Sequence, residues 1–304
     1  MREHRARFVR GEPPFYYMCM GDVTMRRGFI EGSGGVRIAY VDFGGDGPGL
    51  LLLHGLMGRA TTWHNTVSWL ISHFHVVGID QRGHGLSDKP DSSYSIDEYV
   101  NDAGAAIDGL HLGPALIIGH SMGGLVGWTL AARRPELVRG LVIQDMRADH
   151  TGTDSEAEFK DWYAAWPVPF PTMASVREFF GAMRPGLAEY FSEVMVEKDD
   201  GYWPQFSFDH MLRSARAWSG RSFWDVLSQV SCPTLVVGGA LGELSEIEAQ
   251  KMAKRMRSGQ YAEVAAAHHT IHYDQPGAWR AVVEPFLLGL VSRGGSLPCE
   301  TPSG

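Results

Sequence analysis

The chain has 304 residues, a formal net charge of -8 and a hydrophobic fraction of 44%. This length and apolar content suit one large α/β domain with an insertion. The acidic balance excludes a general nucleic-acid binder, which would carry a basic face. The cysteines at 19, 232 and 299 are too few for a disulfide framework and favour a reducing, cytoplasmic compartment. No apolar run reaches the ~18 residues of a membrane span, so we expect no membrane partner.

Strands and helices are expected to alternate over the first half of the chain. The expected strands cover 28–31, 36–43, 49–53, 76–80 and 138–145, and the expected helices cover 61–72 and 95–110. Ser95 and Glu98 have the spacing of a capping box at the start of the second helix. Alternating strands and helices predict crossover connections and a mostly parallel sheet, with the ligand site at the carboxyl ends of the strands.

A strand–turn–helix motif lies near the middle of the chain. An apolar run over 115–118 precedes a helical pattern over 125–133, and Gly119, Ser121 and Gly123 between them fit G-x-S-x-G. In this motif a sharp turn pushes the central side chain out above the sheet, and glycine is needed where neighbouring backbone comes close. Ser121 is therefore a candidate nucleophile at a helix N-terminus, where N–H groups favour a developing negative charge.

The alternation stops over 146–222, a segment rich in aromatic residues and too long for a loop. We expect a helical cap there, with some aromatic side chains lining an apolar pocket over Ser121. The candidates are Trp162, Trp166 and Trp203.

The regular pattern then resumes. Strands are expected over 234–237 and 261–264 and helices over 245–256 and 277–290. Ser245 and Glu248 predict a capping box for the first of these helices. The expected domains are an N-terminal extension over 1–27, a core formed by 28–145 and 223–293, the cap over 146–222, and a disordered tail over 294–304.

Together these motifs resemble the α/β-hydrolase-fold serine hydrolases, especially small esterases and lactonases, over about residues 27–291. The residues that carry the likeness are the His54-Gly55 loop, residues 80–88, the G-x-S-x-G turn and residues 269–276. The resemblance implies a nucleophile, acid, histidine order along the chain, with His269 as the general base. His268 stands where the family usually has glycine. The resemblance also implies an oxyanion hole made by the backbone N–H groups of Leu56 and Met122.

The resemblance leaves two carboxylates as candidates for the acid. Many members place it three residues after a turn glycine, here Gly239, but that position holds Gly242 and the next holds Glu243. Other members use a strand end 24 residues after the serine, which is Asp145 in this chain. That strand should neighbour the strand that leads to Ser121, so its end can reach the histidine. Asp145 is preferred, and Glu243 remains the alternative.

The expected activity is hydrolysis of a carboxylic ester or lactone through an acyl-enzyme on Ser121. A serine argues against the related epoxide hydrolases and haloalkane dehalogenases, which attack through an aspartate. Two alternatives stay open: thioester, C–C bond or perhydrolase chemistry on the same site, or a ligand-binding protein with negligible turnover. The expected partner is a small, apolar or aromatic substrate, and neither a metal nor an organic cofactor is implied. The sequence does not indicate an oligomeric state.

Overall fold

The computed structural model describes residues 16–20 and 23–292. These residues form one nine-stranded sheet with the order β1-β2-β3-β5-β4-β6-β7-β10-β11. Its strands are β1 (Tyr16–Met20), β2 (Val23–Glu31), β3 (Arg37–Gly44), β4 (Gly49–Leu53), β5 (His75–Ile79), β6 (Ala115–His120), β7 (Val138–Gln144), β10 (Thr234–Gly239) and β11 (Gly259–Val264).

The sheet is mostly parallel, as the alternation of elements predicts. β5, β4, β6, β7, β10 and β11 pair in parallel, whereas β1, β2 and β3 form an antiparallel edge. β6 lies between β4 and β7, so the strand that leads to Ser121 is central and buried along its whole length. The end of β7 lies directly beside it.

Helices cover both faces of the sheet. They are α1 (His64–Leu70), α2 (Ile96–Gly109), α3 (Met122–Arg133), α8 (Trp224–Leu227), α9 (Glu246–Arg255), α10 (Ile271–Asp274) and α11 (Pro276–Ser292). Side chains from α2, α3, α8 and α9 join one hydrophobic cluster, and those from α1, α10 and α11 join the other. In β4, Leu51 and Leu53 face the first cluster, while Leu50 and Leu52 face the second. Such two-sided burial explains why the parallel strands read as continuous apolar runs.

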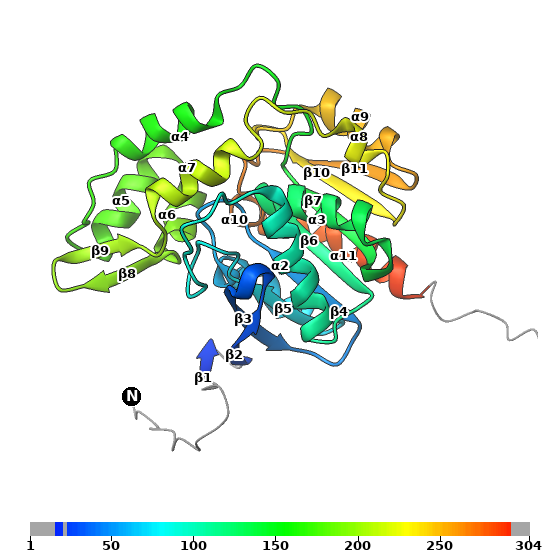
Figure 1. Cartoon of the computed structure of the whole chain (residues 1–304), viewed down its shortest axis with the longest axis horizontal. Coiled ribbons are helices and arrows are strands. Elements are labelled where there is room, and N and C mark those ends of the chain that lie inside the picture. Colours follow the sequence, from blue (N-terminus) through cyan, green and yellow to red (C-terminus); the bar gives the residue numbers. More distant parts are fainter. Residues whose placement is uncertain (1–15, 21–22, 293–304) are drawn as a thin grey trace, which may run out of the picture.

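The insertion between β7 and β10 is a separate group of helices and strands, which we call the cap. It contains α4 (Ser155–Ala164), α5 (Met173–Met183), α6 (Pro185–Ser192), β8 (Met195–Lys198), β9 (Gly201–Pro204) and α7 (Phe208–Arg216). These elements gather on one side of the sheet (Figure 1). The two ends of the insertion are tied together, because Phe223 N–H donates to the Ala148 carbonyl and His150 N–H donates to that of Arg221, both at 2.8 Å.

The structure corrects three details of the sequence prediction. The cap is not wholly helical, since β8 and β9 form an antiparallel hairpin within it. Strands begin before Gly28, so residues 16–20 and 23–27 belong to the sheet rather than to an extension. At α9, Ser245 accepts from Glu248 N–H, but the Glu248 carboxylate binds the N–H groups of Ala148 and Asp149 instead of closing a capping box.

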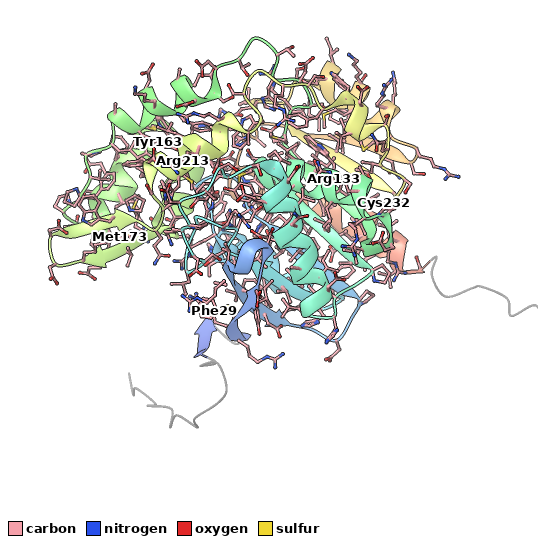
Figure 2. The ribbon with its side chains drawn as sticks, in the orientation of Figure 1. Phe29, Arg133, Tyr163, Met173, Arg213 and Cys232 are labelled. Carbon is pink, nitrogen blue, oxygen red and sulfur yellow. The ribbon has the colours of Figure 1, made fainter. Side chains whose placement is uncertain are left out.

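Two further predictions concern the chain ends and the cysteines. The tail over 294–304 lies outside the described residues. Cys232 is a half-buried free thiol that lies just before β10, far from the cap residues Tyr163 and Met173 (Figure 2). Every helix in the described part of the chain is too short or too polar to span a lipid bilayer.

Candidate active site

Ser121 occupies a strained turn between β6 and α3. Its φ of 51° and ψ of -123° are rare for a residue other than glycine. A Cβ at Gly119 would collide with the Gly123 carbonyl, and one at Gly123 would collide with the Leu53 carbonyl. Both glycines of the motif are therefore required by close backbone contacts, as the spacing predicts. The Ser121 side chain remains partly exposed and lines a cavity beneath the cap.

Two backbone N–H groups near Ser121 make no hydrogen bond within the described part of the chain. Met122 is the first residue of α3, so its N–H has no acceptor within the helix. Leu56 lies on the loop after β4 and lines the same cavity as Ser121. Acyl transfer requires such N–H donors at the oxygen that becomes negative.

Two buried histidines hold the loop that carries Leu56. His54 donates from Nδ1 to the Gly55 carbonyl at 2.8 Å and accepts at Nε2 from Gln81 N–H at 2.9 Å. His84 accepts at Nε2 from Met57 N–H at 3.1 Å. Burial lowers the pKa of His54 to about 4 and that of His84 well below its usual value. Both rings are therefore neutral at pH 7, as these bonds require.

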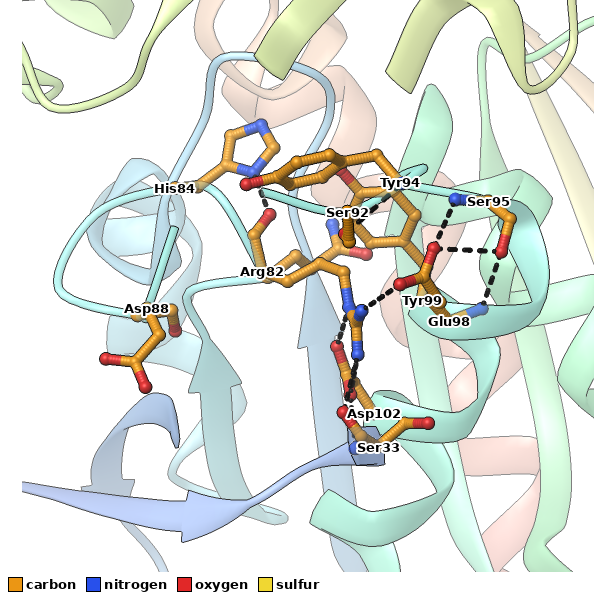
Figure 3. A network of polar contacts seen from close by, with 12 residues as sticks. Ser33, Arg82, His84, Asp88, Ser92, Tyr94, Ser95, Glu98, Tyr99 and Asp102 are labelled. Atoms are coloured by element: carbon orange, nitrogen blue, oxygen red, sulfur yellow. Dashed lines mark hydrogen bonds and ion pairs between the residues drawn. The ribbon is translucent and has the colours of Figure 1, made fainter. Parts of the chain in front are cut away.

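Arg82 anchors the neighbouring loop rather than contacting the cavity. Its guanidinium makes two hydrogen bonds with Asp102, at 2.6 and 2.8 Å, and one with Glu98, at 2.6 Å (Figure 3). It also donates to the Ser33 carbonyl at 3.1 Å. Because the Arg82 carbonyl accepts from Nδ1 of His84, this network indirectly supports the loop of Leu56.

Asp145 follows β7 and is fully buried, with a φ of 49°. Its carboxylate accepts from His269 Nδ1 at 2.7 Å, and from the N–H groups of Gly239, Glu243 and Leu244 at 3.4, 2.9 and 3.4 Å. These donors stabilise a charge that would otherwise be costly to bury. A Cβ at residue 242 would collide with this carboxylate, so Asp145 fills the space beside Gly242.

His269 is also close to Glu243, the alternative acid. The Glu243 carboxylate lies 3.9 Å from His269 Nδ1, and its side chain is 66% exposed. Burial alone would lower the pKa of His269, but Glu243 and the hydrogen-bonded Asp145 raise it to about 9, against an opposing effect of Arg184. His269 and Ser121 line the same cavity, and no hydrogen bond joins their side chains among the described residues.

His120 is a supporting residue that the sequence reasoning did not single out. Its ring is buried, and Nε2 donates to the His269 carbonyl at 3.0 Å. Burial is the main reason that its pKa lies well below the usual value, so this donor stays in the neutral form. The ring thereby links the Ser121 turn to the loop of His269. Its place next to Ser121 in the motif was the only sequence signal.

The space over Ser121 has two arms that share the walls formed by Phe159 and Trp162. The first has a volume of about 210 Å³ and the second about 400 Å³. The first is lined by Leu56, Met57, His120, Ser121, Phe159, Trp162, Arg184, Leu187, Tyr190, Phe191, Glu243, His269 and Thr270. The second also reaches Ser121 and Glu243 and extends to Arg147, His150 and Glu158.

Only one of the three predicted cap tryptophans lines these arms. Trp162 does, but Trp166 packs inside the cap, with ring centroids 4.7 Å from Phe180 and 5.1 Å from Phe191. Trp203 lies on the β8–β9 hairpin, where its indole N–H donates to Asp200 at 2.8 Å. The predictions for Trp166 and Trp203 are therefore wrong, because the hairpin and the internal aromatic core direct these rings elsewhere.

Comparisons with known proteins identify hydrolases among the similar sequences. A family profile described as alpha/beta hydrolase fold matches residues 48–176. The chain is 28% identical to 2-(acetamidomethylene)succinate hydrolase of Mesorhizobium japonicum over 70% of this chain and 78% of that protein. It is 27% identical to 3-oxoadipate enol-lactonase 2 of Acinetobacter baylyi, over 83% of this chain and 93% of that protein.

A solved structure shows the same fold. The crystal structure of E-2-(acetamidomethylene)succinate hydrolase superposes with a TM-score of 0.77 and 24% identity, covering 90% of this chain and 99% of that one. The sheet order, the turn at Ser121 and these similarities lead to one conclusion: the chain has the α/β-hydrolase fold.

Proposed function

We propose that the protein is a serine hydrolase that cleaves a carboxylic ester or lactone through an acyl-enzyme on Ser121. The observation that carries this proposal is the 2.7 Å contact between Asp145 and His269 Nδ1, in a cavity that also contains Ser121. Since Asp145 accepts from Nδ1–H, the His269 Nε2 lone pair is left to take a proton. We assign the acid to Asp145 rather than Glu243 because Asp145 is buried and hydrogen-bonded to the ring, whereas Glu243 is largely exposed.

In the first half-reaction, Ser121 Oγ attacks the carbonyl carbon while His269 takes the hydroxyl proton. The negative oxygen of the tetrahedral intermediate accepts hydrogen bonds from the N–H groups of Leu56 and Met122. Removal of one such donor typically costs about 3 kcal/mol of barrier. The C–O bond to the alcohol then breaks, and His269 returns its proton to the departing oxygen. Asp145 stabilises the charged imidazole throughout.

In the second half-reaction, His269 activates a water molecule that attacks the acyl carbon. The same N–H groups stabilise the second oxyanion, Ser121 leaves with the proton, and the carboxylic acid is released. For a lactone, alcohol and acid belong to one product. The apolar side chains of Phe159, Trp162 and Leu187 suit an apolar portion of the substrate. We place this activity in the cytoplasm, on the basis of the few, scattered cysteines.

The test compares wild type, Ser121→Ala, Asp145→Asn and Glu243→Gln on a panel of p-nitrophenyl esters and lactones. We expect Ser121→Ala to abolish turnover and labelling by a fluorophosphonate, and Asp145→Asn to lower kcat by about 10⁴-fold. Glu243→Gln should retain most of the activity. Thioester, C–C bond or perhydrolase substrates turned over in preference to esters would change the assigned reaction. Stoichiometric binding without turnover or labelling would instead favour a binding protein.

A further inference from the structure

Arg184 lines the first arm of the cavity and is a cation without a partner among the described residues. Among the described residues that line this arm, it is the only lysine or arginine. Its side chain makes no hydrogen bond or ion pair within the described part of the chain. By contrast, Arg147 in the second arm lies 3.5 Å from the Glu248 carboxylate.

The backbone holds Arg184 at a fixed place. It lies between α5 and α6, where its N–H donates to the Phe180 carbonyl and its carbonyl accepts from Leu187 N–H, both at 3.1 Å. Two residues later, a Cβ at Gly186 would collide with the Asp274 carboxylate.

This close approach fastens the start of α6 to the loop of His269. The other oxygen of Asp274 accepts from His268 N–H at 3.0 Å, next to His269. The Arg184 charge acts on the His269 ring, where it opposes the rise in pKa caused by the two carboxylates. The backbone contacts of Arg184 and Gly186 therefore fix the point from which the Arg184 side chain enters the cavity, relative to the loop of His269.

The surroundings of Arg184 favour an anionic partner. Leu187 and Phe191 are apolar, and Glu243 forms no ion pair with Arg184. A guanidinium presents paired N–H donors that match a carboxylate, and such charge-assisted hydrogen bonds strengthen where water is excluded. A neutral substrate filling this arm would cover the guanidinium and leave it unpaired, which is costly.

We propose that the substrate carries a carboxylate that Arg184 binds, so that the enzyme hydrolyses anionic esters or lactones. This inference rests on the proposed acyl-enzyme chemistry at Ser121. It adds a charged end to a substrate whose remaining part lies against the apolar walls. Arg184 is thus a specificity-determining residue that does not touch the reacting bond.

The experiment compares matched anionic and neutral esters. The first set contains the monomethyl esters of succinic, glutaric and adipic acids, each paired with the ester in which a primary amide replaces the free carboxylate. The second set, O-acetylglycolate and O-acetylglycolamide, moves the charge to the alcohol part. Hydrolysis is followed by proton release at constant pH for wild type, Arg184→Gln, Arg184→Lys and Arg177→Gln. Arg177 is the matched control, since it pairs with Glu189 at 3.5 Å outside the cavity.

We expect wild type to prefer the anionic member of at least one set. Arg184→Gln should raise KM for that ester by about 10- to 100-fold, as expected for loss of a charged hydrogen bond. It should leave kcat/KM for the amide within about threefold, and Arg177→Gln should leave both unchanged. Arg184→Lys should recover part of the preference, because it restores charge without the paired geometry.

Equal efficiency on both members of every pair, or an equal loss on both in Arg184→Gln, would overturn the inference while leaving the serine hydrolase intact. Failure of the proposed function looks different, with no turnover and no fluorophosphonate labelling of Ser121. Calorimetric titration of Ser121→Ala with the same anionic esters then tests whether Arg184 binds the carboxylate, because it measures binding and needs no turnover. Binding that is lost in Ser121→Ala/Arg184→Gln supports the inference, and absent or Arg184-independent binding rejects it.

Discussion

Glu243 affects His269 differently from Asp145. Both carboxylates raise the pKa of the imidazole, but Asp145 is buried in direct contact, whereas Glu243 is exposed at 3.9 Å. An exposed charge acts through solvent and is screened by salt. The effect of Glu243 on the pKa of His269 should therefore weaken as the salt concentration rises, whereas the effect of Asp145 should stay constant.

This difference predicts a change in the pH profile of Glu243→Gln. His269 must be neutral to accept the proton, so kcat/KM rises as pH increases through its pKa, which is about 9 with both carboxylates present. Removal of the Glu243 charge lowers that pKa and moves the rise to lower pH. Profiles of kcat/KM against pH at low and high salt check this prediction. High salt should move the wild-type rise to lower pH and leave the profile of Glu243→Gln nearly unchanged.

Glu246→Gln is the matched control for this prediction. Glu246 is an exposed carboxylate at the start of α9 and does not line either arm of the cavity. Its profile should overlay that of wild type. Identical profiles for wild type and Glu243→Gln would show that Asp145 alone sets the pKa of His269.

The cap combines a packing core with one wall of the cavity over Ser121. Trp166 lies in the packing core, where aromatic rings meet edge to face, while Trp162, one helical turn earlier, lines both arms of the cavity. Neighbouring tryptophans on one segment therefore have separate roles. One stabilises the cap, and the other shapes the site.

We expect Trp166→Ala to lower the free energy of unfolding by about 3–5 kcal/mol, because it leaves a large cavity in the cap. Trp162→Ala should destabilise the protein less than Trp166→Ala does, and it should change KM more. Urea unfolding and ester kinetics on the two variants separate these effects. Trp203→Ala on the hairpin is the control, and it should change neither the free energy of unfolding nor KM by much. A larger change in KM for Trp166→Ala than for Trp162→Ala would contradict this division.

The whole molecule contains several histidines that folding keeps neutral. Burial is the largest cause in each case, and it lowers the pKa of His54 to about 4 and that of His272 to about 3. His84 and His120 are shifted in the same direction. Below the unfolded value of about 6.5, the unfolded chain binds protons that the folded chain does not. Stability is therefore lost as the pH falls.

The expected stability curve has its maximum near neutral pH. Each buried histidine with a pKa near 4 should cost about 2 kcal/mol of unfolding free energy at pH 5. His269 has the opposite sign, because its raised pKa stabilises the fold below about 6.5 and this contribution is lost as the pH rises through about 9. Urea unfolding at pH 5, 7 and 9.5 measures the loss of stability on the acid side and on the alkaline side of this maximum. His272→Asn should make the loss of stability at acid pH less steep without removing it, because His54, His84 and His120 remain.

The sequence was sufficient where local sterics dictate structure. Gly119 and Gly123 have to be glycines because backbone passes against both, so the motif predicted the turn at Ser121. The neighbouring ends of β6 and β7 likewise made Asp145 the preferred partner of His269. Alternating apolar segments predicted the parallel sheet.

Other features depend on contacts between distant segments and were not readable from the sequence. Glu248 has the spacing of a capping residue, yet its carboxylate binds the start of the cap about 100 residues away in the chain. The direction of each tryptophan in the cap depends on how α5, α6 and the β8–β9 hairpin pack. The lack of a partner for Arg184 is likewise a property of the assembled fold.

The position of Asp145 also affects how this protein can diverge. Because the carboxylate comes from the residue after β7, the end of β10 and the loop after it contribute main-chain N–H groups to it. Any residue except proline leaves those N–H groups in place, while a Cβ at residue 242 would displace the Asp145 carboxylate. Ala240, Leu241 and Glu243 are thus free to vary, so the rim of the site can acquire new preferences without a change in the acid.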